Sequence, residues 1–200
     1  MVRATPLPVK QTGPMTEPGR IVLLNGTSSS GKSSIATDLL RGWPSPAFRL
    51  AVDDINAMRA KAQTLALDAP ALTETLRRTR AGFHRAVAGM AAAGNDVIMD
   101  HLLSEPWRLA DCLELFRPYA VFFVGVLCDP AELTRRELAR GDREAGTAAA
   151  QLGLVHTHGE YDLTVDTTHR SAADCAADIL AALERPPDPS AFRRLVPGRG

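Results

Sequence analysis

Apolar residues in this chain gather in short continuous runs that alternate with longer segments of helical periodicity. Short continuous runs are typical of strands that are buried on both faces of a sheet. The run Ala-Val-Phe-Phe-Val-Gly-Val-Leu at 120–127 is the strongest of them. The pattern predicts five strands, at 21–24, 48–52, 97–99, 120–127 and 163–165.

The segments between these runs repeat apolar residues at the three- and four-residue spacing of a helix. We expect helices over 33–41, over 55–93 with a break near 68–70, over 105–116, from 129 onward, and over 171–183. Strands that alternate with helices favour a parallel sheet, because each crossover helix packs back on a face of the sheet. The sequence therefore predicts an α/β fold of three layers, with five parallel strands covered by helices on both faces.

Both ends of the chain lack this periodicity. Residues 1–19 contain four prolines, and the segment 185–200 is rich in Pro and Arg. Such compositions are typical of segments that bury little apolar surface. We expect a flexible leader over 1–19, one folded domain over 20–184 and a flexible tail over 185–200.

Composition narrows the class of protein without indicating a reaction. Of 200 residues, 45% are apolar, which is enough for a sizeable core. The 23 basic and 23 acidic residues cancel, and this balance argues against a nucleic-acid partner, whose binders usually carry a basic excess. There is no apolar run of membrane-spanning length, no signal-peptide pattern and no paired spacing among the three cysteines. We expect a cytoplasmic protein without a membrane partner.

Residues 26–33, Gly-Thr-Ser-Ser-Ser-Gly-Lys-Ser, match the phosphate-loop pattern G-x-x-x-x-G-K-[ST] at every fixed position. Gly26 and Gly31 let successive main-chain N–H groups point at phosphate oxygens. Lys32 supplies a cation for the β- and γ-phosphates, and the Ser33 hydroxyl can ligate magnesium. The motif lies between a predicted strand and a predicted helix, as this mechanism requires. We therefore expect ATP and Mg²⁺ to bind here, with nucleotide contacts from Gly26, Thr27, Ser28, Ser29, Ser30, Gly31, Lys32, Ser33 and Ser34.

Two other predicted strands end in aspartates, Asp53-Asp54 and Asp100. The carboxyl ends of parallel strands meet at one edge of the sheet, so these side chains should face the same phosphates. Phosphoryl transfer to an alcohol needs a carboxylate that accepts the hydroxyl proton, and magnesium needs oxygen ligands. Asp53 is the candidate catalytic base, and Asp100 is the candidate metal ligand beside Ser33. The alternative is that one of the paired aspartates caps the next helix, and Asp54 is favoured for that role.

Arg136, Arg140 and Arg143 recur at helical spacing and share one face. Guanidinium groups on one face repel each other unless an anion lies between them. We therefore expect an Arg-rich lid that contacts phosphate, and these arginines are candidate catalytic residues. The alternative is a solvated charged face, on which the arginines pair with Glu137, Asp142 and Glu144.

Together these residues resemble the chloramphenicol phosphotransferase-like proteins, a family of P-loop kinases. The resemblance spans about residues 21–180 and rests on segments 23–33, 52–53, 97–100, 139–143, 155–156, 161–162 and 165–169. It implies a P-loop kinase fold and ATP-dependent phosphorylation of a hydroxyl on chloramphenicol, and hence antibiotic resistance. It also implies that Asp53 is the base, that the three arginines form the lid, and that Asp166 and Thr167 lie beside the adenine pocket.

The chain departs from that family in the region where the acceptor pocket is shaped. Residues 56–80 contain no aromatic side chain and several charges, and His101 follows Asp100 where the family has a second acid. Two alternatives therefore stay open besides chloramphenicol. One is a kinase for another hydroxylated metabolite, antibiotic or nucleotide sugar. The other is a non-catalytic nucleotide-binding regulator, which would need the phosphate loop but not Asp53.

Overall fold

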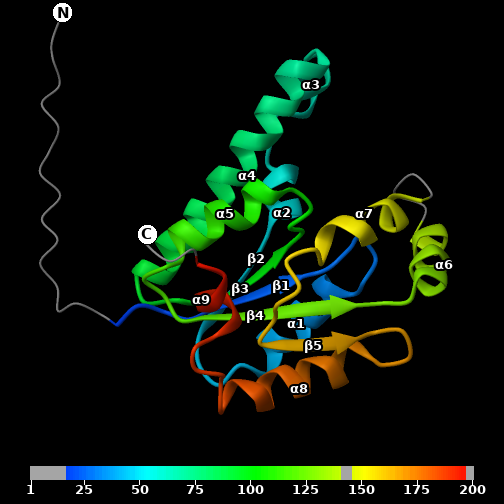
Figure 1. Ribbon diagram of the computed structural model, residues 1–200. Coiled ribbons are helices and arrows are strands. Elements are labelled where there is room, and N and C mark those ends of the chain that lie inside the picture. Colours follow the sequence, from blue (N-terminus) through cyan, green and yellow to red (C-terminus); the bar gives the residue numbers. More distant parts are fainter. Residues whose placement is uncertain (1–16, 141–145, 197–200) are drawn as a thin grey trace, which may run out of the picture.

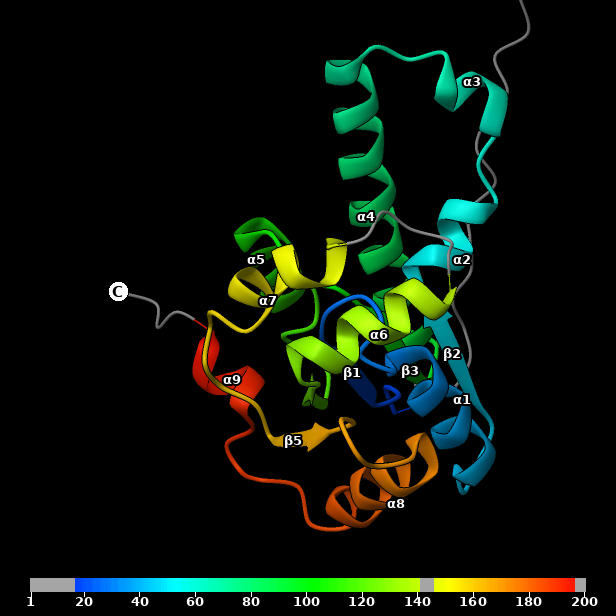
Figure 2. The same cartoon turned by 90° about the vertical axis from the view of Figure 1, so that its right-hand side faces the viewer.

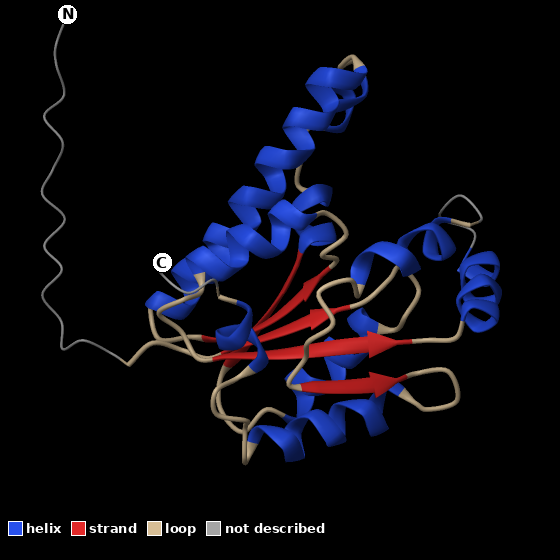
Figure 3. Cartoon of the chain, viewed as in Figure 1, coloured by secondary structure: helices blue, strands red, loops and turns tan. Residues whose placement is uncertain are grey.

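A computed structural model describes residues 17–140 and 146–196. Within these ranges, five strands form one parallel sheet in the order β2-β3-β1-β4-β5, with helices on both faces (Figures 1 and 3). This confirms the predicted three-layer α/β fold. The strands are β1 (Ile21–Asn25), β2 (Ala47–Ala51), β3 (Asp96–His101), β4 (Val121–Leu127) and β5 (Leu163–Asp166).

Alternate residues of β1 face opposite layers of the molecule, as the two-residue period of a strand requires. Ile21 and Leu23 belong to the core that α4 and α5 cover, whereas Val22 and Leu24 belong to the core beneath α1 and α8. All four side chains are buried, so both faces of the sheet are closed to water. The covering helices are α1 (Lys32–Gly42), α4 (Ala69–Ala92), α5 (Pro106–Leu115) and α8 (Ala172–Leu183).

The strand register brings the carboxyl ends of three strands side by side. In β1 and β3, Leu24 pairs with Asp100 and Asn25 pairs with His101. In β2 and β3, Ala51 also pairs with Asp100. The loop that follows β1 and the residues that follow β2 therefore start next to the acid at the end of β3.

The long helical segment expected over 55–93 divides into three helices: α2 (Val52–Ala57), α3 (Lys61–Leu65) and α4. The predicted break near 68–70 is confirmed, because the Asp68 carboxylate accepts a hydrogen bond from the Ala71 N–H at 2.8 Å and caps α4. The α3 helix and the first turns of α4 project away from the sheet (Figures 1 and 2).

Two helices cross the edge of the sheet after β4: α6 (Pro130–Arg140) and α7 (Thr147–Val155). The start of α6 is as expected, since the Asp129 carboxylate accepts a hydrogen bond from the Ala131 N–H at 2.8 Å. The sequence analysis did not predict α7. It does not have a clear amphipathic stripe, because most of its residues are Ala, Leu, Gly or Val.

The segment after residue 184 differs from the expected flexible tail. It forms α9 (Ala191–Leu195), and Phe192 is buried against Phe116 and Phe123 in the core beneath α4 and α5. The Asp162 carboxylate accepts a hydrogen bond from the Ala191 N–H at 2.6 Å. The folded unit therefore continues beyond 184. The expected leader lies outside the described residues over 1–16.

Candidate active site

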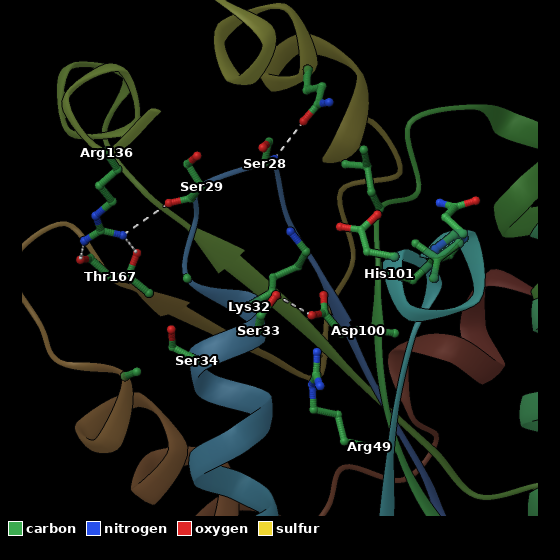
Figure 4. Close-up of a pocket in the computed structure, with 18 of the residues that line it drawn as sticks. Ser28, Ser29, Lys32, Ser33, Ser34, Arg49, Asp100, His101, Arg136 and Thr167 are labelled. Atoms are coloured by element: carbon green, nitrogen blue, oxygen red, sulfur yellow. Dashed lines mark hydrogen bonds between the residues drawn. The ribbon is translucent and has the colours of Figure 1, made fainter. Parts of the chain in front are cut away.

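A pocket of about 670 Å³ opens at the carboxyl edge of the sheet (Figure 4). Its walls come from the loop after β1, the ends of β2 and β3, and helices α2, α4, α5 and α6. Ten of the residues singled out from the sequence line it: Ser28, Ser29, Gly31, Lys32, Ser33, Ser34, Asp53, Asp100, Arg136 and Thr167. Residues far apart in the sequence therefore meet in one cavity, as the strand ends predict.

The loop between β1 and α1 has the backbone shape of a phosphate cradle. Ser29 and Gly31 adopt left-handed conformations, with φ of 58° and 91°, and such turns point successive N–H groups inward. Gly26 allows a close approach to β4, because a Cβ atom there would lie 2.5 Å from the Val126 carbonyl oxygen. No side-chain hydrogen bond caps α1 among the described residues. The positive end of this helix is thus directed at the pocket.

Lys32 is the first residue of α1, and its side chain points back towards the loop (Figure 4). Its side chain is largely buried, and its ammonium group donates a hydrogen bond to the Thr27 carbonyl oxygen at 2.6 Å. The lysine is thereby held close to the N–H groups that would surround a phosphate.

Ser33 and Asp100, the two predicted metal ligands, are in direct contact. The Ser33 hydroxyl donates a hydrogen bond to the Asp100 carboxylate at 2.6 Å (Figure 4). Magnesium in nucleotide sites usually takes one or two protein oxygens and completes its octahedron with phosphate oxygens and water. The two oxygens fit that role. The described residues contain no cluster of three or more His, Cys, Asp or Glu that could hold a metal alone, so nucleotide phosphates would have to complete the ligand set.

Asp53 lies in the first turn of α2 and lines the pocket. The alternative that Asp53 or Asp54 caps α2 is wrong, because the helix starts at Val52, before either aspartate, and Ala51 takes the cap position without a side-chain bond. Both acids instead lie in the first turn of α2, where the helix dipole favours a negative charge. Asp54 forms an ion pair with Arg49 at 3.5 Å.

Arg136 lies over the loop and the end of β5 (Figure 4). Its guanidinium donates hydrogen bonds to the Thr167 carbonyl oxygen at 2.6 Å, to the Thr167 hydroxyl at 3.1 Å and to the Ser29 carbonyl oxygen at 3.4 Å. It also pairs with Glu132 at 2.8 Å. Arg136 therefore ties α6 to the rim of the cradle.

The rest of the predicted lid is only partly described. Arg140 is the last residue of α6, and Arg143, Asp142 and Glu144 lie outside the described residues. Among the described residues, Arg136 pairs with Glu132 and not with Glu137, and a pairing of Glu137 with Arg140 or Arg143 lies outside what the structure describes. The Glu137 carboxylate, largely buried, accepts hydrogen bonds from the N–H groups of Gly146 at 2.8 Å and Ala148 at 3.0 Å, and so holds the start of α7.

The two residues expected beside the adenine pocket take different positions. Thr167 is buried and lines the pocket, and its hydroxyl donates a hydrogen bond to the Ser30 carbonyl oxygen at 2.8 Å. Asp166 does not belong to the pocket lining. It accepts hydrogen bonds from the Thr168 hydroxyl and N–H, which hold the pKa of its carboxyl below the usual range.

Sequence reasoning missed several residues of the pocket. Gln151 of α7 accepts a hydrogen bond from the Ser28 N–H at 2.7 Å and so links α7 to the cradle. Arg49, Arg80 and Arg108 line the side formed by β2, α4 and α5. These four residues belong to no recognisable local motif. Only the folded chain brings them together.

A buried histidine pair adjoins the same side of the pocket. His84 contacts the Asp111 carboxylate through Nδ1 at 2.6 Å and His101 through Nε2 at 3.0 Å. If His84 donates to the carboxylate, then His101 Nε2 must be the donor to His84 and His101 Nδ1 carries a lone pair. That Nδ1 atom is buried and has no hydrogen-bond partner in the described structure.

This chain is similar to known proteins both in sequence and in fold. The family model of chloramphenicol phosphotransferase-like protein matches residues 19–184. A protein of Mycobacterium tuberculosis named "Putative O-phosphotransferase Rv2636" is 29% identical over 197 residues, which cover 88% of each chain.

Solved structures share the fold at lower identity. The APS kinase CysC of Mycobacterium tuberculosis, in complex with AMPPNP and APS, has a TM-score of 0.65 and 19% identity over 84% of this chain and 98% of its own. The tunicamycin resistance protein of Deinococcus radiodurans has a TM-score of 0.63 and 17% identity over 82% and 95%. Shikimate kinase of Acinetobacter baumannii has a TM-score of 0.61 and 14% identity over 85% and 94%.

These likenesses concern the fold, whereas the family match concerns the sequence. The family match runs from just before β1 to the end of α8 and includes the phosphate loop, Asp53 and Asp100. The chain is therefore a P-loop phosphotransferase and belongs to the family of chloramphenicol phosphotransferase-like proteins.

Proposed function

We propose that this protein transfers the γ-phosphoryl group of ATP, bound with Mg²⁺, to a hydroxyl group of a small molecule. The observation that carries the proposal is one pocket lined by Lys32, by the bonded pair Ser33 and Asp100, and by Asp53. These side chains supply the three parts that phosphoryl transfer needs: a phosphate cradle, a metal site and an acceptor base.

The loop would hold the triphosphate through its main-chain N–H groups and Lys32. The Lys32 ammonium would exchange its bond to the Thr27 carbonyl oxygen for bonds to the β- and γ-phosphates. Ser33 and Asp100 would hold magnesium, which when bound neutralises charge on the phosphate oxygens. Arg136 would keep α6 against the cradle and add positive charge at its rim.

Asp53 would act on the acceptor. Its carboxylate takes the proton of the hydroxyl as the hydroxyl oxygen forms a bond to the γ-phosphorus. The bond from that phosphorus to the bridging oxygen of ADP breaks in the same transfer, and ADP leaves with the electron pair. A non-catalytic regulator would have no use for a carboxylate in this place, so the pocket position of Asp53 favours an enzyme.

The expected partners are ATP and a small acceptor. Chloramphenicol is the acceptor that the family suggests, and the alternative is another hydroxylated metabolite, antibiotic or nucleotide sugar. No helix in the described ranges combines the length and the apolar character needed to cross a bilayer.

The test is a phosphorylation screen with purified protein, ATP and Mg²⁺. The panel contains chloramphenicol and other hydroxylated compounds, uncharged and anionic, and mass spectrometry looks for products heavier by one phosphoryl group. Binding of AMPPNP with Mg²⁺ is measured in parallel by calorimetry. Absence of nucleotide binding would refute the proposal, and binding without any transfer across a broad panel would favour the regulator.

A further inference from the structure

The side of the pocket beyond Asp53 has a chemical character of its own. We call it the acceptor end and define it by Asn56, Arg80, His101, Leu102 and Arg108, which come from α2, α4, the end of β3 and α5. The cradle and Thr167 lie at the opposite side of the pocket, because they follow β1 and β5, and the strand order is β2-β3-β1-β4-β5. If ATP occupies the cradle as proposed above, the acceptor end is the part left for the second substrate.

Arg108 is an unusual residue for such a wall because its side chain is only 6% exposed. It donates a hydrogen bond to the Leu102 carbonyl oxygen at 2.8 Å and pairs with Glu105. Its Nε atom is buried and has no partner among the described residues. A buried guanidinium is costly unless its donors and its charge are matched.

Arg80 has no described acid within ion-pair distance, although the charges of Glu105 and Asp53 act on it from farther away. It is half-buried and lines the pocket, and within the described structure it has no ion pair or hydrogen bond of its side chain. Burial lowers the pKa of its guanidinium, and the neighbouring charges of Arg108 and Arg59 lower it further, whereas those of Glu105 and Asp53 act in the opposite direction. Arg59 itself has two buried nitrogens, Nε and Nη1, without a described partner. Arg80 and Arg108 thus line one end of the cavity, and Arg59, outside the lining, adds its positive charge near Arg80.

The acids of the pocket do not balance this charge. Asp53 and Asp100 are the acids in the described pocket lining, and the proposed function uses Asp53 at the acceptor hydroxyl and Asp100 at the magnesium. Glu105 is half-exposed and accepts hydrogen bonds from Arg108 and Trp107, and its charge acts on Arg80 only from farther away. His101 does not add an anion, and burial lowers its pKa so that it stays neutral near pH 7.

We propose that the acceptor is anionic: a hydroxylated small molecule whose carboxylate, phosphate or sulfate group binds between Arg80 and Arg108 while its hydroxyl faces Asp53. This inference rests on the proposed function and names its class of substrate. The planar donors of arginine match two oxygens of such a group, and the partly buried site strengthens the attraction. An uncharged molecule such as chloramphenicol would leave Arg80 without a bound anion.

The first experiment separates the two ends of the pocket. Protein is saturated with AMPPNP and Mg²⁺, which fill the cradle, and is then titrated calorimetrically with inorganic sulfate against chloride of equal ionic strength. We expect sulfate to bind the loaded protein. Arg80→Gln should weaken that binding about tenfold or more, the loss of one charge-assisted contact, while the affinity for AMPPNP stays the same.

Arg78→Gln is the matched control, because Arg78 lies on the same helix, is 68% exposed and faces Glu74 instead of the pocket. It removes the same charge and should bind sulfate as the unmodified protein does. Thermal melts of both variants check that they fold. Absence of sulfate binding to the loaded protein, or equal binding by Arg80→Gln, would overturn the inference. Failure of AMPPNP itself to bind would instead remove the proposed function, and this inference with it.

Turnover gives a second, independent test. With the best acceptor from the screen, Arg80→Gln should raise the KM for the acceptor about tenfold or more and leave the KM for ATP near its original value. A higher kcat/KM for an uncharged acceptor than for every anionic compound of the panel would contradict an anionic substrate.

Discussion

Asp53 and Asp54 are adjacent in the sequence yet have different surroundings. Asp53 lines the pocket, whereas Asp54 pairs with Arg49 at 3.5 Å and is 59% exposed. Successive residues in the first turn of a helix point about 100° apart, which accounts for the difference. Only one of the two carboxylates therefore lines the pocket in which we propose that the acceptor hydroxyl binds.

We expect Asp53→Asn to bind AMPPNP with Mg²⁺ as tightly as the unmodified protein but to transfer phosphate about 10² to 10⁴ times more slowly, since it cannot take the hydroxyl proton. Single-turnover kinetics and calorimetry measure the two properties separately. Asp54→Asn, the adjacent control, should lose far less activity. Parallel loss of nucleotide binding and transfer in Asp53→Asn would assign this residue to the metal or to the fold.

The buried histidine pair makes a prediction about pH. Burial lowers the pKa of both His84 and His101 below the ordinary value of 6.5. The unfolded chain then binds more protons than the folded protein once pH falls below about 6.5. The two histidines thus contribute fully to the free energy of unfolding above that pH. This contribution is lost progressively as the pH falls towards the pKa values of the folded protein. His156 and His158 have lowered pKa values as well and act in the same direction.

We therefore expect the free energy of unfolding in urea to be lower at pH 5.5 than at pH 7.5, by about 1.4 kcal/mol for each full pKa unit that titrates in this range. His101→Gln should make this drop smaller. His169→Gln, which changes an exposed histidine, should leave the drop as it is. A pH dependence that is the same in all three proteins would show that the buried pair does not titrate.

At the scale of elements, α7 depends on contacts with residues far from it in sequence. Its first N–H groups bond to Glu137 of α6, and its Gln151 bonds to the Ser28 N–H of the cradle at 2.7 Å. The helix thereby connects the segment after β4 with the phosphate loop. Its stability and the shape of the cradle should be linked.

Glu137→Ala should release the start of α7, because it removes the carboxylate that accepts hydrogen bonds from the N–H groups of Gly146 and Ala148. We expect a local loss of about 1 to 3 kcal/mol, seen as faster hydrogen exchange of the Gly146 and Ala148 amides, together with weaker AMPPNP binding. Glu114→Ala, on the exposed side of α5, is the control. Unchanged exchange at these amides would show that the cap does not hold the helix.

At the scale of the whole molecule, the structural features that a short sequence pattern encodes could be predicted. The five strands follow from continuous apolar runs, and the contact of Ser33 with Asp100 follows from the phosphate-loop pattern and the rule that parallel strands end at one edge. The rest depends on tertiary contacts. Phe192 follows a Pro-rich stretch and still fills the core, and Arg80 and Arg108 meet from two helices with no shared motif.

Phe192→Ala tests whether the segment beyond 184 belongs to the domain. We expect a loss of about 3 to 5 kcal/mol in the free energy of unfolding, because the side chain is buried against two other phenylalanines. Urea denaturation measures it, with Arg193→Ala on the exposed face of α9 as the control. A loss below about 1 kcal/mol would show that the segment beyond 184 is not an integral part of the folded domain.

The uneven packing of α4 has a consequence for how such enzymes diverge. All of the buried residues of this helix, Phe83, His84, Val87 and Ala91, lie in its second half, and the first half stands clear of the sheet (Figure 2). Mutations at solvent-facing positions of that first half cost little stability. Under the proposed function, evolution can therefore reshape the wall that carries Arg80, and with it the choice of acceptor, while the proposed ATP site stays unaltered.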